Sequence, residues 1–232
     1  MIGAIVPVHD EEAHLDACLA AVRRAAAHPA LGGEPVRIVV ALDRCSDGSA
    51  AIAARHGAHA VVPERGNVGR ARGAAAAAAI ALGARWIAST DADSVVPPDW
   101  LHRQLGFACD AFCGVVEVRD WGGYADGVAD AFGRAQLRCD DHPHVHGANL
   151  GVRADLYLRC GGFPPLPAHE DVALVDALAR QGARIARRAT PAVATSARRL
   201  ARAAGGFAAY LGALERRVCG AAGGPLAAGA RS

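Results

Sequence analysis

Residues 86–94 read WIASTDADS, a short apolar run that ends in two aspartates two positions apart. In an extended strand, residues i and i+2 point to the same side, so Asp91 and Asp93 would present two carboxylates together at the end of a buried strand. Such a pair can hold a divalent cation against a phosphate. Acidic pairs also top ordinary solvated turns, so the spacing alone leaves both interpretations open.

Strand-like and helix-like segments alternate upstream of this pair. Apolar runs predict the strands, and apolar side chains at helical spacing or alanine-rich stretches predict the helices. The predicted strands cover residues 3–8, 36–42, 59–62 and 86–89, and the predicted helices cover residues 12–26, 50–56 and 70–82. This order, with continuous apolar strands, is typical of an α/β fold with a mostly parallel sheet covered by helices on both faces.

Acidic residues follow three of these strands. They lie in the segments 8–11, 43–44 and 91–93. Ligands of open α/β sheets bind at the carboxyl ends of the strands. We therefore expect the three acidic segments to converge on one crevice.

The second half of the chain is less regular. Its pattern predicts helices at 98–109, 127–138, 154–159, 170–181 and 207–218, strands at 112–118 and 150–152, an edge strand at 183–186, and a frayed tail at 220–232. We expect one α/β domain over residues 1–195, with a nucleotide-binding half (1–95) and an acceptor half (96–195). An Arg/Ala/Gly-rich, partly flexible segment, 196–232, follows it.

Composition excludes several classes of function. The 25 basic and 23 acidic residues nearly cancel, and aromatic residues make up 5% of the chain, so a nucleic-acid partner is not indicated. The seven cysteines form no C-x-x-C pair, which favours reduced thiols in the cytoplasm. No segment approaches the roughly 18 apolar residues of a membrane-spanning helix. Peripheral membrane contact stays open because arginines cluster at 198, 199 and 202.

Four segments in order carry a resemblance to a known family. They read VPVHDEE (6–12), LDRCSDGS (42–49), TDAD (90–93) and HED (169–171). Together they resemble the inverting family-2 glycosyltransferases of the GT-A fold, over about residues 2–187. The resemblance implies a nucleoside-diphosphate-sugar donor, a divalent metal (Mn²⁺ or Mg²⁺), and transfer of the sugar to an acceptor hydroxyl. The size of the chain favours a small or lipid-linked acceptor.

The resemblance also assigns nucleotide-binding residues. Pro7, His9 and Glu11 occupy the loop that lines the nucleoside, and Asp43 matches the carboxylate that accepts a hydrogen bond from the base. A carboxylate there can accept the N3–H of uracil, which favours a UDP-linked donor. Arg72 matches the basic residue near the base and diphosphate, although a place on a solvated helix face is the alternative.

The remaining assignments concern the metal and the reaction. Asp93 matches the direct metal ligand, and Asp91 the residue that contacts the ribose or a metal-bound water. The catalytic candidates are Glu170 and Asp171, with Asp171 as general base; the alternative is that both only stabilise a helix N-terminus. Asn149 would meet the donor or the acceptor.

Two further features leave alternatives open. His142, His144 and His146 alternate in a polar segment, which favours an acceptor loop over a zinc site. Arg198, Arg199 and Arg202 would form either a lid over the diphosphate or a basic face.

The chain also departs from the family pattern. Arg44 stands where many relatives have a second acidic residue, and His9 where many have an aromatic one. A sugar nucleotidyltransferase, the nearest rival, would need a glycine-rich first loop with a lysine, and this chain has no lysine. A non-catalytic nucleotide-sugar-binding protein is the other alternative.

Overall fold

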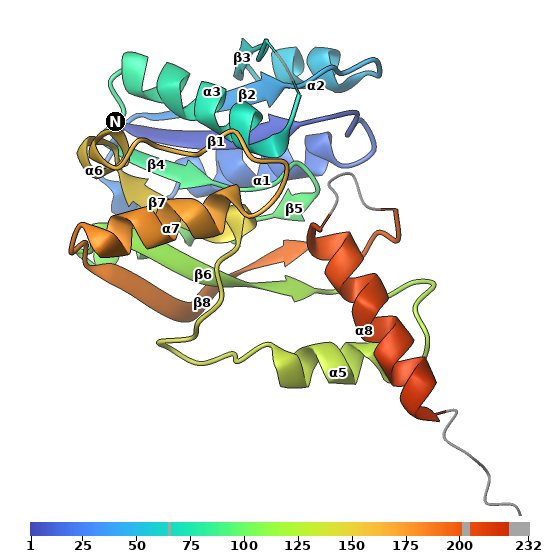
Figure 1. Ribbon diagram of the computed structural model, residues 1–232. Coiled ribbons are helices and arrows are strands. Elements are labelled where there is room, and N and C mark those ends of the chain that lie inside the picture. Colours follow the sequence, from blue (N-terminus) through green and yellow to red (C-terminus); the bar gives the residue numbers. More distant parts are fainter. Residues whose placement is uncertain (65, 201–204, 223–232) are drawn as a thin grey trace, which may run out of the picture.

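The computed structural model describes residues 1–64, 66–200 and 205–222 of the chain. Its centre is a curled sheet of eight strands in the order β3-β2-β1-β4-β7-β6-β8-β5 (Figure 1). The strands are β1 (Ile2–Val8), β2 (Val36–Leu42), β3 (His59–Val61), β4 (Trp86–Ser89), β5 (Ser94–Val95), β6 (Ala111–Val118), β7 (Leu150–Arg153) and β8 (Ile185–Thr195). All strands except β5 and β7 run in one direction, which confirms the predicted mostly parallel α/β sheet.

Helices cover both faces of the sheet. The α-helices are α1 (Leu15–Ala26), α2 (Ser49–Arg55), α3 (Val68–Ala81), α4 (Trp100–Gly106), α5 (Val128–Ala135), α6 (Ala154–Arg159), α7 (Glu170–Arg180) and α8 (Phe207–Ala222), and the short 3-10 helices are η1 (Pro29–Leu31) and η2 (Gly147–Asn149). One buried cluster joins α1, α2 and α4 to one face, and a second joins α3, α6 and α7 to the other (Figure 1). None of the helices in the described ranges is both long and apolar enough to cross a membrane.

Small residues bring α3 close to the sheet. Ala71, Ala75 and Ala79 are buried against it, and a Cβ atom added to Gly3 of β1 would lie 2.7 Å from the Cβ of Ala79. Such a distance is shorter than van der Waals contact, so the pair requires glycine and alanine. The close approach positions Arg72, on the same helix, beneath the carboxyl end of the sheet.

The predicted edge strand at 183–186 is present but too short. The observed strand β8 begins at Ile185, continues to Thr195 and pairs with β6, while β5 pairs only with Ala194 and Thr195, so residues 185–186 do lie at the edge of the sheet. The local sequence does not predict a strand of this length, because charged residues and proline are depleted in strands and the segment contains Arg187, Arg188 and Pro191. The parallel partner β6 supplies the pairing that local sequence does not indicate.

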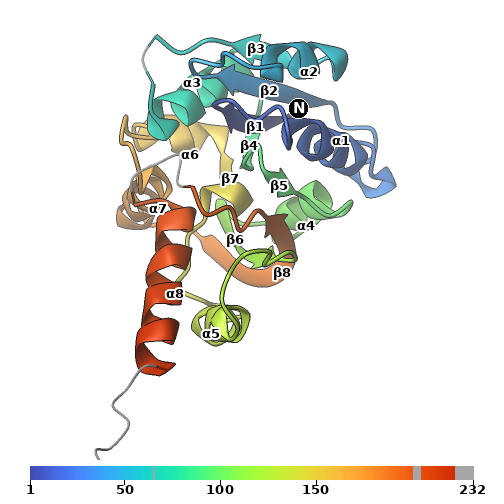
Figure 2. The same ribbon diagram turned by 90° about the vertical axis from the view of Figure 1, so that its right-hand side faces the viewer.

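A third apolar cluster lies apart from the sheet. It joins α5 and α8 through Val128, Phe132, Leu211 and Leu214, and the two helices lie side by side below the sheet (Figures 1 and 2). The predicted helix at 207–218 is therefore present and extends to Ala222. Of the predicted frayed tail, residues 223–232 lie outside the described residues, and the division at residue 195 stays a prediction.

Candidate functional site

A cavity of about 630 Å³ opens at the carboxyl ends of β1, β2 and β4. It is lined by nine of the ten site residues predicted from the sequence, namely Pro7, His9, Glu11, Asp43, Arg72, Asp91, Asp93, Glu170 and Asp171. The three acidic segments therefore converge as expected. Strands β2 and β3 follow β1 on one side, whereas β4 lies on its other side, so the crevice lies where the connection order of the sheet reverses.

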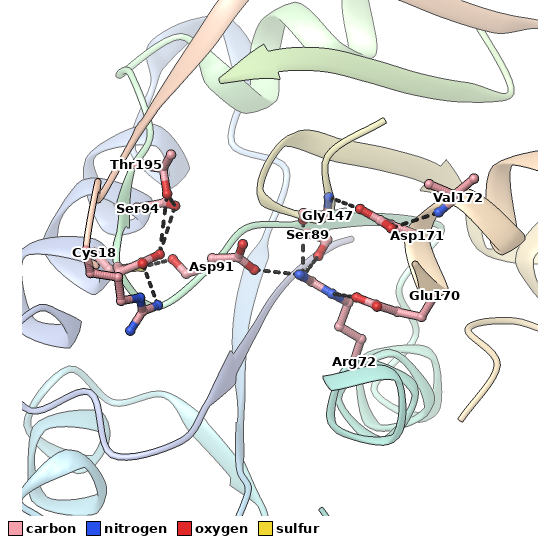
Figure 3. Close-up of polar contacts among 12 residues, drawn as sticks. Cys18, Arg72, Ser89, Asp91, Ser94, Gly147, Glu170, Asp171, Val172 and Thr195 are labelled. Atoms are coloured by element: carbon pink, nitrogen blue, oxygen red, sulfur yellow. Dashed lines mark hydrogen bonds and ion pairs between the residues drawn. The ribbon is translucent and has the colours of Figure 1, made fainter. Parts of the chain in front are cut away.

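Arg72 lies at the base of the cavity and is almost completely buried. Its guanidinium donates hydrogen bonds to Glu170 (2.7 Å), the Ser89 hydroxyl (2.7 Å) and Asp91 (2.6 Å), as Figure 3 shows. Burial alone would lower the pKa of Arg72, but the carboxylates of Asp91 and Glu170 outweigh it and raise that pKa. The solvated-face alternative is thus wrong, and Arg72 fixes the positions of two acidic side chains from different halves of the chain.

Asp93 is buried close to two other carboxylates. Burial and the nearby carboxylates of Asp91 and Glu11 together raise the pKa of its carboxyl to about 6, against the opposing effect of the Arg198 guanidinium. The Arg198 guanidinium lies 2.5 Å from Asp93 and also donates to Glu11. The carboxylates therefore require a cation, which Arg198 supplies in this structure.

Hard carboxylate oxygens are also the ligands that Mg²⁺ and Mn²⁺ prefer. Asp91 and Asp93 both border the cavity, and the Asp91 side chain is 34% exposed. The residues present thus fit a divalent metal. The link between Glu11 and Asp93 through Arg198 was not predicted, since no sequence pattern joins residues that lie this far apart in the chain.

Asp171 lies at the start of α7, on the opposite wall. One carboxylate oxygen accepts the backbone N–H of Gly147 at 2.6 Å, and the other accepts that of Val172 at 2.8 Å (Figure 3). Its neighbour Glu170 is buried in the ion pair with Arg72. The structure therefore separates the two catalytic candidates: Glu170 positions Arg72, and Asp171 is the carboxylate held at the cavity wall by backbone donors.

Asp43 and His9 lie at the ends of β1 and β2, on another part of the cavity wall. The Asp43 side chain is buried at the cavity wall, with the Arg44 Nε 3.4 Å from its carboxylate. His9 Nδ1 lies 2.7 Å from the Asp43 backbone carbonyl, so Nδ1 carries the proton that it donates. Nearby, Asp47 accepts the backbone N–H of Ser49 at the start of α2, an interaction that stabilises the beginning of that helix.

The structure places Asn149 away from the cavity wall. Its side chain is fully buried, accepts a hydrogen bond from Trp100 Nε1 (3.0 Å), and donates to the carbonyls of Val115 (2.9 Å) and Pro191 (2.8 Å). These bonds use both N–H groups and one acceptor position of the amide, and Asn149 does not line the cavity. The side chain joins α4, β6 and β8.

The alternating histidines form a stack. Ring centroids of His142 and His144 are 5.6 Å apart, and those of His144 and His146 are 5.9 Å apart. Among the described residues, Asp10, Cys45 and Asp47 bring three ligand atoms close enough to share a metal ion, and the histidines belong to no such group of three. His144 and His146 line the cavity beside Gln136, a residue that the sequence did not single out.

Comparisons with known proteins agree with this geometry. A family model described as glycosyl transferase family 2 matches residues 4–159. A search of curated protein sequences found no match.

Solved structures share the fold. The crystal structure of S. aureus TarS 1–349 in complex with UDP-GlcNAc is 16% identical, with a TM-score of 0.62 over 83% of this chain and 57% of that one. Glucosyl-3-phosphoglycerate synthase from Mycobacterium tuberculosis, in complex with Mn²⁺, UDP and phosphoglyceric acid, is 21% identical, with a TM-score of 0.61 over 94% of this chain and 76% of that one. The chain spans about 60% of the length of TarS 1–349.

Proposed function

The chain belongs to glycosyl transferase family 2, and from this premise we propose that it transfers a sugar, with inversion, from a UDP-sugar to an acceptor hydroxyl with the help of a divalent metal. The observation that carries the proposal is the meeting of Asp43, Asp91, Asp93 and Asp171 around one cavity. Asp43 would recognise the base, the aspartate pair the metal, and Asp171 the acceptor.

The binding half of the site rests on the residues at the strand ends. Pro7, His9 and Glu11 would line the nucleoside, and Asp43 would accept the N3–H of uracil. Asp93, with Asp91, would hold Mn²⁺ or Mg²⁺, which as a Lewis acid stabilises the charge that develops on the departing diphosphate. Arg72 would keep Asp91 in place rather than contact the base.

The transfer step itself requires one general base. Asp171 would take the proton of the acceptor hydroxyl as that oxygen forms a bond to the anomeric carbon, from the side opposite the diphosphate. Because both carboxylate oxygens are held by backbone N–H groups, the side chain is preorganised for this task. The bond from the anomeric carbon to the diphosphate oxygen breaks, and its electron pair leaves with UDP.

Calorimetry with UDP and Mn²⁺ tests the binding half, and UDP release from a panel of UDP-sugars tests turnover. Binding without turnover by any donor would instead support a non-catalytic nucleotide-sugar-binding protein. Analysis of the anomeric configuration of the product then tests inversion.

We predict that Asp171→Asn lowers the transfer rate by a factor of about 10²–10⁴, the usual contribution of a general base, while UDP affinity is retained. Asp176→Asn is the matched control, because Asp176 lies on the exposed side of the same helix. Transfer by Asp171→Asn at the rate of the control would rule out the assigned base.

A further inference from the structure

A strip of polar side chains leads away from Asp171 along the cavity wall. The Gly147 N–H that holds Asp171 follows His146 directly, and His146 stacks on His144. His144 Nε2 in turn accepts the backbone N–H of Leu137 at 3.1 Å, next to Gln136. Gln136, His144 and His146, the polar strip, thus connect the proposed base to the carboxyl end of α5.

Two atoms of the polar strip are buried without a hydrogen-bond partner among the described residues. They are Oε1 of Gln136 and Nε2 of His146, and both residues line the cavity. Nearly all buried polar atoms in folded proteins are hydrogen-bonded, so each of these atoms calls for a ligand or water group. An amide oxygen accepts only, whereas a neutral imidazole nitrogen either donates or accepts, depending on its tautomer.

Aromatic side chains lie close to the polar strip. Phe207 and Tyr210 of α8 line the cavity and pack against Phe132, with ring centroids at 5.8 and 6.5 Å. Phe132 precedes Gln136 by one helical turn, so the aromatic rings and the polar strip are neighbours. The faces of such rings pack well against apolar C–H groups, including those of a sugar ring.

The charges of the cavity oppose an anionic acceptor. Its described lining residues carry six carboxylates and three guanidinium groups, and Arg44, Arg72 and Arg198 are each already paired with a carboxylate. A divalent metal would not cancel the excess of negative charge, and the donor diphosphate would add to it. Burial and the neighbouring histidines lower the pKa of His146 to about 4, so its ring is uncharged at neutral pH.

We propose that the polar strip, with Phe207 and Tyr210, is an acceptor subsite for an uncharged, hydroxyl-rich compound, a sugar or glycoside. Hydroxyl groups of the acceptor satisfy Gln136 and His146, and its apolar face packs on the aromatic rings. The proposal rests on the proposed function, because the acceptor hydroxyl passes its proton to Asp171 as its oxygen bonds to the anomeric carbon and UDP departs.

An acceptor panel tests the chemical class. The protein of residues 1–232 receives Mn²⁺, a UDP-sugar, and one of four acceptors: methyl glycosides, octyl glycosides, the same methyl glycosides bearing a 6-phosphate, or phosphoglyceric acid. We expect UDP release above the acceptor-free rate, and a glycosylated product, with the uncharged glycosides. The two alkyl lengths distinguish a free sugar from one at a lipid surface.

Two results would overturn the inference. One is a higher kcat/KM for the phosphorylated or carboxylated acceptors than for the uncharged glycosides. The other is that no uncharged glycoside produces a response while the UDP-sugar is bound. In either case the proposed function survives if UDP and Mn²⁺ bind and donor is consumed, whereas failure of UDP to bind at all would instead contradict the proposed function.

His146→Phe tests the polar strip directly. Phenylalanine keeps a ring that can stack on His144 but removes the unpartnered nitrogen, so a purely structural histidine would be replaced without loss. We expect the KM for the glycoside to rise about tenfold, the usual effect of one lost hydrogen bond, with unchanged UDP affinity. The control is His102→Phe, in the His28–His102 stack outside the cavity (centroids 5.2 Å apart), where the KM should not change. A KM for His146→Phe equal to that of the control would refute the role of this residue.

Discussion

At the scale of single residues, the site is a set of carboxylates whose charges the fold must compensate. Arg72 compensates Asp91 and Glu170, and Arg198 compensates Glu11 and Asp93. The two arginines differ in exposure, since Arg72 is 4% exposed and Arg198 is 26% exposed. Arg72 is therefore a fixed part of the structure, whereas the more exposed Arg198 is the cation that the proposed metal would have to displace.

This arrangement predicts that Arg198→Gln strengthens metal binding. Removing the guanidinium takes one ion pair from each of Glu11 and Asp93, so the metal-free protein should lose about 1–3 kcal/mol of stability. Added Mn²⁺ should then raise its thermal midpoint more than that of the wild type. Arg199→Gln is the control, because Arg199 pairs with Glu215 at the surface. Equal Mn²⁺ responses of both variants would contradict competition between Arg198 and the metal.

The raised pKa of Asp93 predicts a pH dependence of stability. Since the pKa rises from 3.8 to about 6 on folding, the protonated carboxyl stabilises the metal-free fold. This contribution is fully present below pH 3.8 and is lost as pH rises through about 6. Between pH 4 and 7, the wild type should therefore lose about 2–3 kcal/mol relative to Asp93→Asn. Denaturant unfolding of both proteins without metal measures this, and a constant difference would contradict the environment assigned to Asp93.

At the scale of elements, the beginnings of two helices set the geometry of the site. The start of α3 packs against the loop before α7, where the Gly69 N–H donates to the Leu166 carbonyl at 3.1 Å. A Cβ atom at Gly69 would lie 2.2 Å from the carbonyl oxygen of Pro164. The loop is thus held directly on α3, and it leads straight into Glu170 and Asp171.

Gly69→Ala should consequently displace this loop. We expect a loss of about 1–3 kcal/mol in stability, typical of overpacking, and a lower transfer rate because Asp171 shifts. Gly73→Ala, one turn later on α3, is the matched control: its nearest neighbour would be 3.7 Å away, an ordinary contact. Alanine should stabilise that position by up to about 1 kcal/mol. Similar losses in both variants would refute the role of close packing at Gly69.

At the scale of the whole molecule, three apolar clusters hold the helices in place. Two of them attach helices to the faces of the sheet, and the third joins α5 to α8. This third cluster places Phe207 and Tyr210 at the cavity, and Ala197, next to Arg198, belongs to it as well. The α5–α8 unit therefore connects the acceptor side of the cavity to the cation at Asp93.

Phe132→Ala should loosen this unit without unfolding the sheet. Phe132 is 4% exposed and contacts Trp121, Phe207 and Tyr210. Its truncation should lower hydrogen-exchange protection in α8 by about 3–5 kcal/mol, up to the stability of that unit, while β1 and β4 keep their protection. Equal loss of protection in α8 and β1 would show instead that the molecule opens as one unit.

The sequence by itself determined the α/β order of the first half and the acidic segments at its strand ends. These features are local: apolar runs, helical spacing and short motifs record them within a few residues. Because parallel strands place their carboxyl ends together, the sequence alone assigns Asp43, Asp91 and Asp93 to one crevice.

Only the tertiary structure decided which of the site residues are free to act. Asn149 is consumed by bonds to three different elements, and Glu170 by its ion pair with Arg72. The length of β8 depends on pairing with β6, and the role of Arg198 depends on carboxylates far away in the chain. These properties arise from contacts between distant segments, and the energies of such contacts leave no periodic trace in the sequence. The two aspartates at 91 and 93 are evident in the sequence, but the pairing of Asp91 with Arg72 and of Asp93 with Arg198 is evident only in the fold.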